Sequence, residues 1–264
     1  MTEARSTLPK TADVHCEIGD DHVAALTLSR PPDNTLDPEL ADSLATALEA
    51  LDSDDRCRAV LLRAEGRHFC AGAALRPSGG PVFDPAGPHL YDHALRLFAT
   101  TKPIVAAVRG AAVGGGLGLA LAADLRVGTP STRMTANFAR LGFHHGFALT
   151  ETLPAVVGQQ AALDLLYTGR RLDGEQAARI GLLDRLVDDE DLDRTAREWA
   201  AEIAASAPLA LQSIRKTMRG DLLDRAREAM RHERAEQQRL RETADYAEGV
   251  RAYAQRRPGR FRGC

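Results

Sequence analysis

The sequence predicts a layered α/β fold. Short apolar runs of strand length alternate with longer amphipathic segments of helix length, and Pro or Gly residues separate them. Toward the C-terminus the strand-like runs stop, and only helical patterns follow. A chain of 264 residues can bury one large core, or one core with a helical appendage.

Composition narrows the possible classes of function. With 44% hydrophobic and 27% charged residues, the chain has the make-up of an ordinary globular protein. A net charge of −3 gives no basic face for nucleic acid, and no apolar run is long enough to span a bilayer. The polar segment 1–13 lacks the apolar core of a signal peptide. We therefore expect a cytoplasmic protein with neither a nucleic-acid nor a membrane partner.

The cysteines give no framework. They are scattered and show no C-x-x-C spacing, which argues against a zinc site and against a disulfide scaffold. A reduced compartment fits this usage. The four residues are Cys16, Cys57, Cys70 and Cys264.

The first elements are a strand, a helix and a second strand. Residues 23–28 are apolar almost throughout, and Arg30-Pro31-Pro32 ends that strand. Pro38 opens a helix that runs to about residue 51, and residues 59–63 form the next strand. The helix carries its large apolar side chains on one stripe, at Leu40, Leu44, Leu48 and Leu51.

The middle of the chain continues the alternation. Residues 69–73 follow a turn, and the Pro- and Gly-rich segment 77–88 predicts a loop. The further elements expected here are helices over 89–99, 117–122 and 148–157 and strands over 103–108 and 124–127.

The C-terminal part changes character after about residue 161. A helix over 174–180 and a strand over 184–187 precede an almost wholly helical remainder, broken at Ala207-Pro208 and at Gly220. The run 222–257 is dense in Arg, Glu and Ala. It is either a solvated amphipathic helix with i,i+4 ion pairs or a helix whose narrow apolar stripe docks on a neighbouring subunit. We expect two regions: a core over 1–190 that holds the functional site, and a helical oligomerisation region over 191–264.

The most informative motif is the glycine triplet Gly114-Gly115-Gly116, between an apolar strand and an apolar helix. Glycines allow close backbone packing and leave amide N–H groups exposed at a helix N-terminus. Such a place can hold an oxygen that gains negative charge during a reaction. The alternative is a tight strand-to-helix turn without chemistry.

These pieces together resemble the crotonase superfamily, which includes enoyl-CoA hydratases and isomerases. The resemblance covers almost the whole chain, and the order and spacing of the motifs make it specific. It implies the crotonase (ClpP-like) β-β-α superhelix followed by helices that build a trimer or a dimer of trimers. The motifs that carry it are Leu26-Thr27-Leu28-Ser29-Arg30-Pro31, the 69–73 segment, 102–110, the glycine triplet, Ala123-Asp124, 166–170, 177–183 and a closing Arg260-Phe261.

The resemblance also implies a mechanism. An acyl-CoA thioester would be held in an oxyanion hole made by the backbone N–H groups of Ala73 and Gly115, and the hole would stabilise an enolate-like oxygen. Coenzyme A would be part of the substrate, with no other cofactor and no metal. Contacts to coenzyme A are expected from Arg30, Ala71, Arg76 and Phe261, with Lys102 as a further basic candidate.

The acid–base residues of the family do not carry over. Hydratases place one glutamate where this chain has Gly118 and a second where it has Phe138. A related dienoyl isomerase and a dehalogenase use an aspartate where this chain has Gly146. None of these side chains can move a proton, so hydration by two glutamates is not expected.

Other residues must then carry protons if the protein is an enzyme. His144 and His145 lie on a glycine-flanked loop that the resemblance places beside the thioester, and imidazole titrates near neutral pH. Tyr91, on the helix over 89–99, could donate a hydrogen bond to the acyl group. For each of these residues a purely structural role is the alternative.

Two classes of function follow. The first is an acyl-CoA enzyme that works through an enolate; within it, isomerisation, decarboxylation and C–C bond hydrolysis need fewer carboxylates than hydration does. The second is a catalytically silent protein that holds acyl-CoA for a partner. The second class is suggested because the chain keeps both oxyanion-hole positions but lacks both catalytic glutamates of the family.

Overall fold

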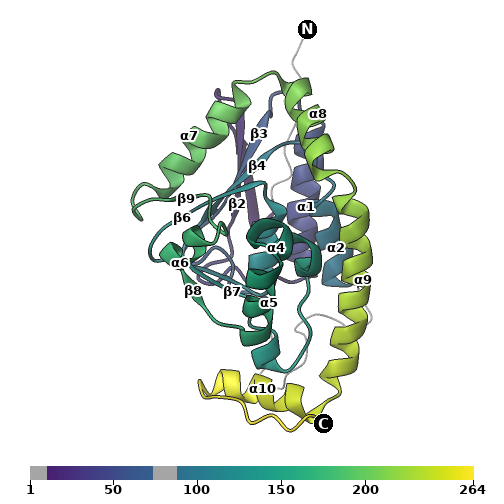
Figure 1. The fold of residues 1–264 in the computed structure, drawn as a ribbon. Coiled ribbons are helices and arrows are strands. Elements are labelled where there is room, and N and C mark those ends of the chain that lie inside the picture. The colour runs from purple at the N-terminus through teal and green to yellow at the C-terminus, as the bar shows by residue number, and fades with distance from the viewer. Residues whose placement is uncertain (1–10, 74–87) are drawn as a thin grey trace.

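The computed structural model describes residues 11–73 and 88–264. Arg76 and almost all of the loop predicted over 77–88 lie outside the described residues. The predicted alternation of strands and helices is confirmed, and Figure 1 shows a central sheet with helices on both sides.

The central sheet has six strands in the order β1-β2-β3-β4-β6-β9. Strand β1 pairs antiparallel with β2, and all the other pairs are parallel. Strand β1 was not predicted, although its apolar and polar residues alternate as an edge strand's do. The strands are β1 (Val14–Ile18), β2 (Val23–Leu28), β3 (Ala59–Ala64), β4 (Ile104–Val108), β6 (Leu125–Gly128) and β9 (Arg185–Leu186).

Both faces of this sheet are covered, which explains why its central strands β2, β3 and β4 are apolar at nearly every position. Along β3, Val60 and Leu62 pack in the larger core, whereas Ala59 and Leu61 point to the opposite face. Helix α7 (Leu192–Ala204) covers that opposite face (Figure 1). Its buried alanines recur every four residues, at 196, 200 and 204, so the helix can approach the strands closely.

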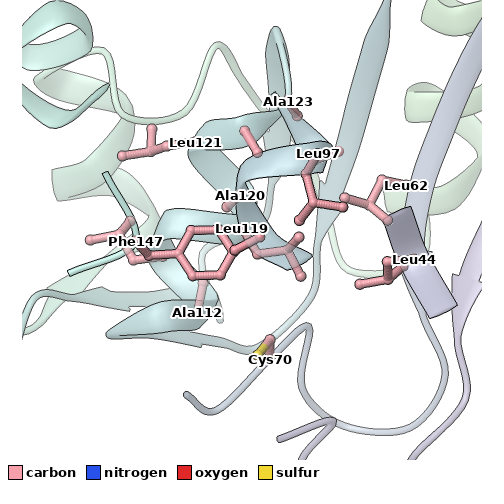
Figure 2. Packing of buried hydrophobic residues seen from close by; sticks show 14 of the residues in the cluster. Leu44, Leu62, Cys70, Leu97, Ala112, Leu119, Ala120, Leu121, Ala123 and Phe147 are labelled. Atoms are coloured by element: carbon pink, nitrogen blue, oxygen red, sulfur yellow. The ribbon is translucent and has the colours of Figure 1, made fainter. Parts of the chain in front are cut away.

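The larger core lies between the sheet and helices α1 (Pro38–Asp52), α2 (Leu90–Leu97) and α3 (Gly115–Ala122). Helix α1 starts where predicted: the Asp37 side chain accepts from the Leu40 N–H, and Pro38 occupies the first turn. Its predicted leucine stripe is buried. Figure 2 shows side chains from α1, β3, α2 and α3 meeting there, at Leu44, Leu62, Leu97 and Leu119.

A second sheet has three strands in the order β5-β7-β8, and its first strand, β5, ends directly before the glycine triplet. Its strands are β5 (Ala111–Val113), β7 (Arg133–Thr135) and β8 (Leu172–Asp173). The helical elements that follow α3 are the short η1 (Ala139–Leu141), α4 (Leu149–Val157), α5 (Gln159–Thr168) and α6 (Gly174–Arg179).

The C-terminal helices are α8 (Pro208–Arg219), α9 (Leu222–Arg241) and α10 (Ala244–Ala254). The predicted breaks at Pro208 and Gly220 are confirmed. The single helix expected over 222–257 is wrong, because the Thr243 side chain accepts from the Tyr246 N–H and starts a new helix.

Helix α9 is more than a solvated rod. It packs against α2 and α4 of its own chain and buries one face, which includes the polar Glu233 and Gln237. Its exposed face carries ion pairs spaced by three residues, such as Arg227–Asp224 and Arg231–Glu228. The helix is therefore not simply solvated, and docking of its apolar stripe on a neighbouring subunit stays a prediction. Within residues 11–73 and 88–264, no helix is both long and apolar enough to cross a bilayer.

Candidate active site

The glycine triplet forms the junction between β5 and α3. Gly114 has a positive φ of 54° and caps the helix without a side chain, which explains why glycine stands there. A Cβ at Gly116 would lie 2.1 Å from the carbonyl oxygen of Cys70. The helix therefore begins in direct contact with the 69–73 segment, and only glycine permits this approach.

Hydrogen bonds bring the two expected oxyanion amides to the same place. The Val113 N–H donates to Cys70 at 3.0 Å, so 70–73 runs beside the triplet. Leu36 pairs with Ala73, and its side chain lies 3.4 Å from the position of a Cβ on Gly115. Ala73 and Gly115 thus flank one leucine. In the part of the chain that the structure describes, we find no acceptor for either N–H group.

The position that the resemblance assigns to the first glutamate is filled by a phenyl ring. A Cβ on Gly118 would lie 2.6 Å from both Cβ and Cδ1 of Phe147. Phe147 is fully buried and contacts Phe98 at 6.5 Å between ring centroids. Figure 2 shows its ring against α3, close to Leu119. A larger residue at 118 would displace this ring.

A second ring occupies the other glutamate position. Phe138 is 8% exposed, and its Cζ lies 3.5 Å from the position of a Cβ on Gly114. Its ring meets Phe143 edge-on at 5.6 Å. Both expected carboxylate positions beside the glycine triplet are therefore aromatic and apolar.

The loop between η1 and α4 is held by a carboxylate from α9. Phe147 and Ala148 both adopt positive φ, 63° and 56°, which non-glycine residues rarely do. Glu233 accepts from the N–H of Ala148 at 2.9 Å, and from the N–H and hydroxyl of Thr150 at 3.1 and 2.7 Å. This carboxylate caps the N-terminus of α4, where negative charge is favourable. Burial nevertheless raises the pKa of Glu233.

The two predicted histidines stack on each other at 4.1 Å between ring centroids. His145 Nε2 lies 2.9 Å from the Thr150 hydroxyl and 3.9 Å from Glu233. The His144 ring meets His232 of α9 edge-on at 5.8 Å. Burial, with the nearby His144 and His232, lowers the pKa of His145 to about 4, so this ring is neutral at pH 7.

Tyr91 reaches the same loop from α2. A Cβ on Gly146 would lie 1.6 Å from the Tyr91 hydroxyl oxygen, so glycine at 146 makes room for this hydroxyl. Gln237 Nε2 lies 2.7 Å from the same Cβ position, so the amide and the hydroxyl are neighbours. Gln237 also donates to the His144 carbonyl at 2.9 Å. Burial, and secondarily the charge of Glu233, raises the pKa of Tyr91, so the phenol stays protonated across the physiological range.

Sequence reasoning singled out Tyr91 and the two histidines but missed Glu233 and Gln237. Both lie in a helix dense in charged residues, and nothing in the local pattern separates buried polar residues from solvated ones. The weak apolar stripe of Ala226, Ala229 and Met230 marks the buried face in retrospect.

The residues expected to contact coenzyme A are dispersed. Ala71 lines a cleft of about 830 Å³. Arg30 donates to Asp13 and Asp37, so its guanidinium is already engaged by carboxylates. Phe261 is 45% exposed, whereas Lys102 is buried, which removes it from a solvent-facing phosphate site. The basic lining of the cleft comprises Arg67, His68, Arg109, Arg133 and Arg171.

No group of three or more His, Cys, Asp or Glu side chains suited to a metal ion occurs among residues 11–73 and 88–264.

The comparisons with known proteins all point to the same family. The family model for enoyl-CoA hydratase/isomerase matches residues 19–263. The chain is 37% identical over 225 residues to a probable enoyl-CoA hydratase of Mycobacterium tuberculosis, covering 84% of this chain and 87% of the relative. It is 33% identical over 260 residues to the 1,2-epoxyphenylacetyl-CoA isomerase of Escherichia coli, covering 94% and 97%.

A solved structure agrees with these relatives. An enoyl-CoA hydratase/isomerase from Pseudoalteromonas atlantica superposes with a TM-score of 0.86 at 31% identity, covering 95% of this chain and all of that one. The expected crotonase fold is thereby confirmed.

Proposed function

We propose that this chain, which belongs to the enoyl-CoA hydratase/isomerase family, is an enzyme that binds an acyl-CoA thioester and stabilises its enolate with the N–H groups of Ala73 and Gly115. The observation that carries the proposal is that both residues meet Leu36, which pairs with Ala73 and places its side chain 3.4 Å from the position of a Cβ on Gly115. Two such donors stabilise the negative charge that develops on the thioester oxygen. Loss of one oxyanion donor typically costs about 3–4 kcal/mol of transition-state stabilisation.

Tyr91 is the proton donor in this proposal. Its hydroxyl lies beside the Gln237 amide, and its ring meets Phe147, which packs on α3, edge-on at 6.5 Å. The raised pKa keeps the phenol protonated at pH 7, so it cannot take up a proton as a base. It remains a far stronger acid than the α-C–H group of a thioester and can therefore protonate the enolate. Tyr91 would give its proton to the α-carbon of the enolate and regain one from water.

This donor favours reactions that create an enolate without a carboxylate base. In a decarboxylation, the C–C bond to a leaving carboxylate breaks and CO₂ departs. The bonding pair becomes the enolate, and Tyr91 protonates the α-carbon. Cleavage of another C–C bond would use the same enolate. Hydration by two glutamates finds no support, because Phe147 and Phe138 fill those positions.

His144 and His145 are the rival proton carriers. Both imidazoles lie toward α9, and their recognised partners are Thr150, His232 and each other. The depressed pKa of His145 makes it a weak base near pH 7. Gln237 donates to the His144 carbonyl and lies beside the Tyr91 hydroxyl. The histidines are therefore near the phenol, and the experiment includes variants of both.

The test is turnover and α-proton exchange with a panel of β-keto-, malonyl-type, enoyl- and dienoyl-CoA thioesters in D₂O, followed by mass spectrometry and NMR. We expect deuterium at the α-carbon of at least one product, and loss of its incorporation in Tyr91→Phe. The variants His144→Ala and His145→Ala are run in parallel. Full activity in Tyr91→Phe with loss in a histidine variant would transfer the role to that histidine.

A second candidate function is a catalytically silent acyl-CoA-binding protein. The observation that favours it is the pair of phenyl rings at the expected carboxylate positions. Tight binding of the thioesters without exchange or turnover across the whole panel would support it. Absence of binding would overturn both candidates.

We also propose that the chain assembles as a homotrimer or a dimer of trimers. The outer face of α8 leaves Leu209, Ile214 and Met218 between 60% and 80% exposed, which is unusual for side chains of this kind on a monomer. Light scattering after size-exclusion chromatography would measure the mass of the assembly, and a monomeric mass would contradict the proposal.

A further inference from the structure

Helix α9 delivers two buried polar side chains, Glu233 and Gln237, to the loop and the phenol of the candidate site. They are 0% and 4% exposed and lie four residues apart, so they project from the same face of the helix. Uncompensated burial of a carboxylate and an amide is costly, and the hydrogen bonds that the described residues make to these two side chains come from the loop over 142–148 and from Thr150.

We propose that Glu233 and Gln237 are positioning residues for the reaction: they fix Tyr91 and the loop over 142–148 in reach of the thioester. The inference rests on the proposed function and deepens it by assigning a task to a helix outside the family motifs. Neither residue has to contact substrate for this role.

Glu233 determines where the loop goes. Its two oxygens take three donors from Ala148 and Thr150, which lie 85 and 83 residues before it in the chain. These bonds hold the two consecutive left-handed residues, Phe147 and Ala148, that turn the Phe147 ring onto α3. The same Thr150 hydroxyl contacts His145 Nε2 at 2.9 Å. The Glu233 carboxylate thus fixes the positions of both the Phe147 ring and the His145 ring.

Gln237 determines where the phenol goes. Its amide donates to the His144 carbonyl at 2.9 Å. Its Nε2 and the Tyr91 oxygen lie 2.7 and 1.6 Å from the position of a Cβ on Gly146. Amide and phenol therefore share the space that a side chain at 146 would need, and the amide limits where the hydroxyl can go.

Glu233 and Gln237 have opposite effects on the pKa of the Tyr91 phenol. The charge of Glu233 raises the pKa of Tyr91, and the hydrogen bond from Gln237 lowers it. The other charged group that acts on the phenol from α9 is Arg241, which lowers its pKa. On α2, His89 stacks edge-on with the Tyr91 ring at 4.7 Å, and burial lowers the pKa of His89 to about 4, so it is neutral.

The experiment compares the Tyr91 resonance of the full-length protein and its variants at pH 7, read by ¹³C NMR of tyrosine labelled at Cζ, with Tyr91→Phe to identify the signal. The variants are Glu233→Gln, which removes the charge, and Gln237→Met, which removes the amide but keeps the length. Glu228→Gln is the matched control, because Glu228 lies on the exposed face of α9 and pairs with Arg231. Circular dichroism establishes that each variant is folded.

We expect the chemical shift of the Tyr91 Cζ to change in Gln237→Met, which removes the amide beside the hydroxyl, and in Glu233→Gln, which loosens the loop that the hydroxyl contacts. Glu228→Gln should leave the resonance unchanged. An unmoved Tyr91 resonance in both folded variants, or an equal change in Glu228→Gln, would overturn the inference. If one variant does not fold, the resonance in the other still decides.

Activity supplies the second measurement. With a thioester that the wild type processes, we expect kcat to fall about tenfold to a hundredfold in both variants while KM stays within about twofold, because only the donor is misplaced. If the wild type processes no thioester, the proposed function fails. The NMR comparison, which needs no substrate, still tests the positioning of Tyr91 separately.

Discussion

The two halves of the candidate site are built by different means. The half that we propose binds the thioester carbonyl consists of backbone amides from two neighbouring segments, Gly72-Ala73 and the glycine triplet. The half that would handle protons consists of side chains from three distant elements: Tyr91 on α2, the histidine loop, and Glu233 with Gln237 on α9. The first half depends on a backbone conformation, and the second depends on tertiary packing.

This difference explains how one half can stay constant while the other is replaced. Amides are present at every residue, so the carbonyl half tolerates changes of side chain as long as the glycines stay. In the proton half, Phe147 and Phe138 fill the positions where the family resemblance expects carboxylates, and a phenol lies where Gly146 leaves room. We infer that binding and chemistry in this fold can change independently.

The largest effect is expected from a methyl group in the carbonyl half. Gly116→Ala would place its Cβ 2.1 Å from the Cys70 carbonyl oxygen, where backbone must move. We expect a loss of about 3 kcal/mol or more of unfolding free energy and no measurable thioester binding. Gly115→Ala is the control, because its Cβ would meet only side chains at 3.4 and 3.8 Å. Equal stability of the two variants, measured by urea denaturation, would contradict the close approach described.

The next effect lies in the proton half. Tyr91→Phe removes the proton donor but keeps the ring, and we expect kcat to fall about 10²–10⁴-fold, the range typical of a lost general acid. The thioester Kd, measured by calorimetry, should change little because the carbonyl half is intact. A weakened Kd with unchanged kcat would show that the two halves are not independent.

A smaller effect is expected from restoring a carboxylate. Gly118→Glu collides with the Phe147 ring at 2.6 Å, and overpacking with a buried charge should cost about 1–3 kcal/mol of unfolding free energy. Combining it with Phe147→Ala should recover part of this loss, and the double-mutant cycle measures the coupling. Additive costs would mean that the ring does not occupy the glutamate position.

The smallest effect is a pH dependence from the histidine loop. His145 has a pKa of about 4 in the folded state against 6.5 as its ordinary value, so the unfolded state binds the proton first as pH falls. Above about pH 6.5 the ring is neutral in both the folded and the unfolded state, so its burial has no pH-dependent cost. As pH falls from there toward 4, the free energy of unfolding decreases by about 1–3 kcal/mol. The wild type should therefore lose more stability than His145→Gln over this range in thermal denaturation. Parallel curves for the two proteins would show that burial of this ring has no such cost.

Local signals in the sequence were sufficient for only one of the two segments of the carbonyl half, the glycine triplet. Asp37 and Pro38 mark the start of α1, and the glycine triplet marks the start of α3, because caps and positive φ values restrict which residues can stand there. The loop over 69–73 could be matched to the triplet only through the family resemblance, since no local rule pairs segments so far apart.

The proton half could be predicted only in part. Tyr91 and the histidines were identifiable as titratable residues near the expected site, but their partner Glu233 lies 85 residues beyond the backbone amide of Ala148 that it caps. In a helix rich in Arg and Glu, a buried carboxylate looks like its solvated neighbours. Burial of that face depends on contacts with α2 and α4, which periodicity alone does not contain.

The position of α9 late in the chain has a consequence for biosynthesis. The central sheet, the glycine triplet and the histidine loop are all translated before Glu233 and Gln237 leave the ribosome. A nascent chain can therefore assemble its carbonyl cradle while the phenol still lacks the partners that orient it. Under the proposed function, the chain would become able to turn over substrate only when this helix docks, and an unfinished chain would not act on thioesters prematurely.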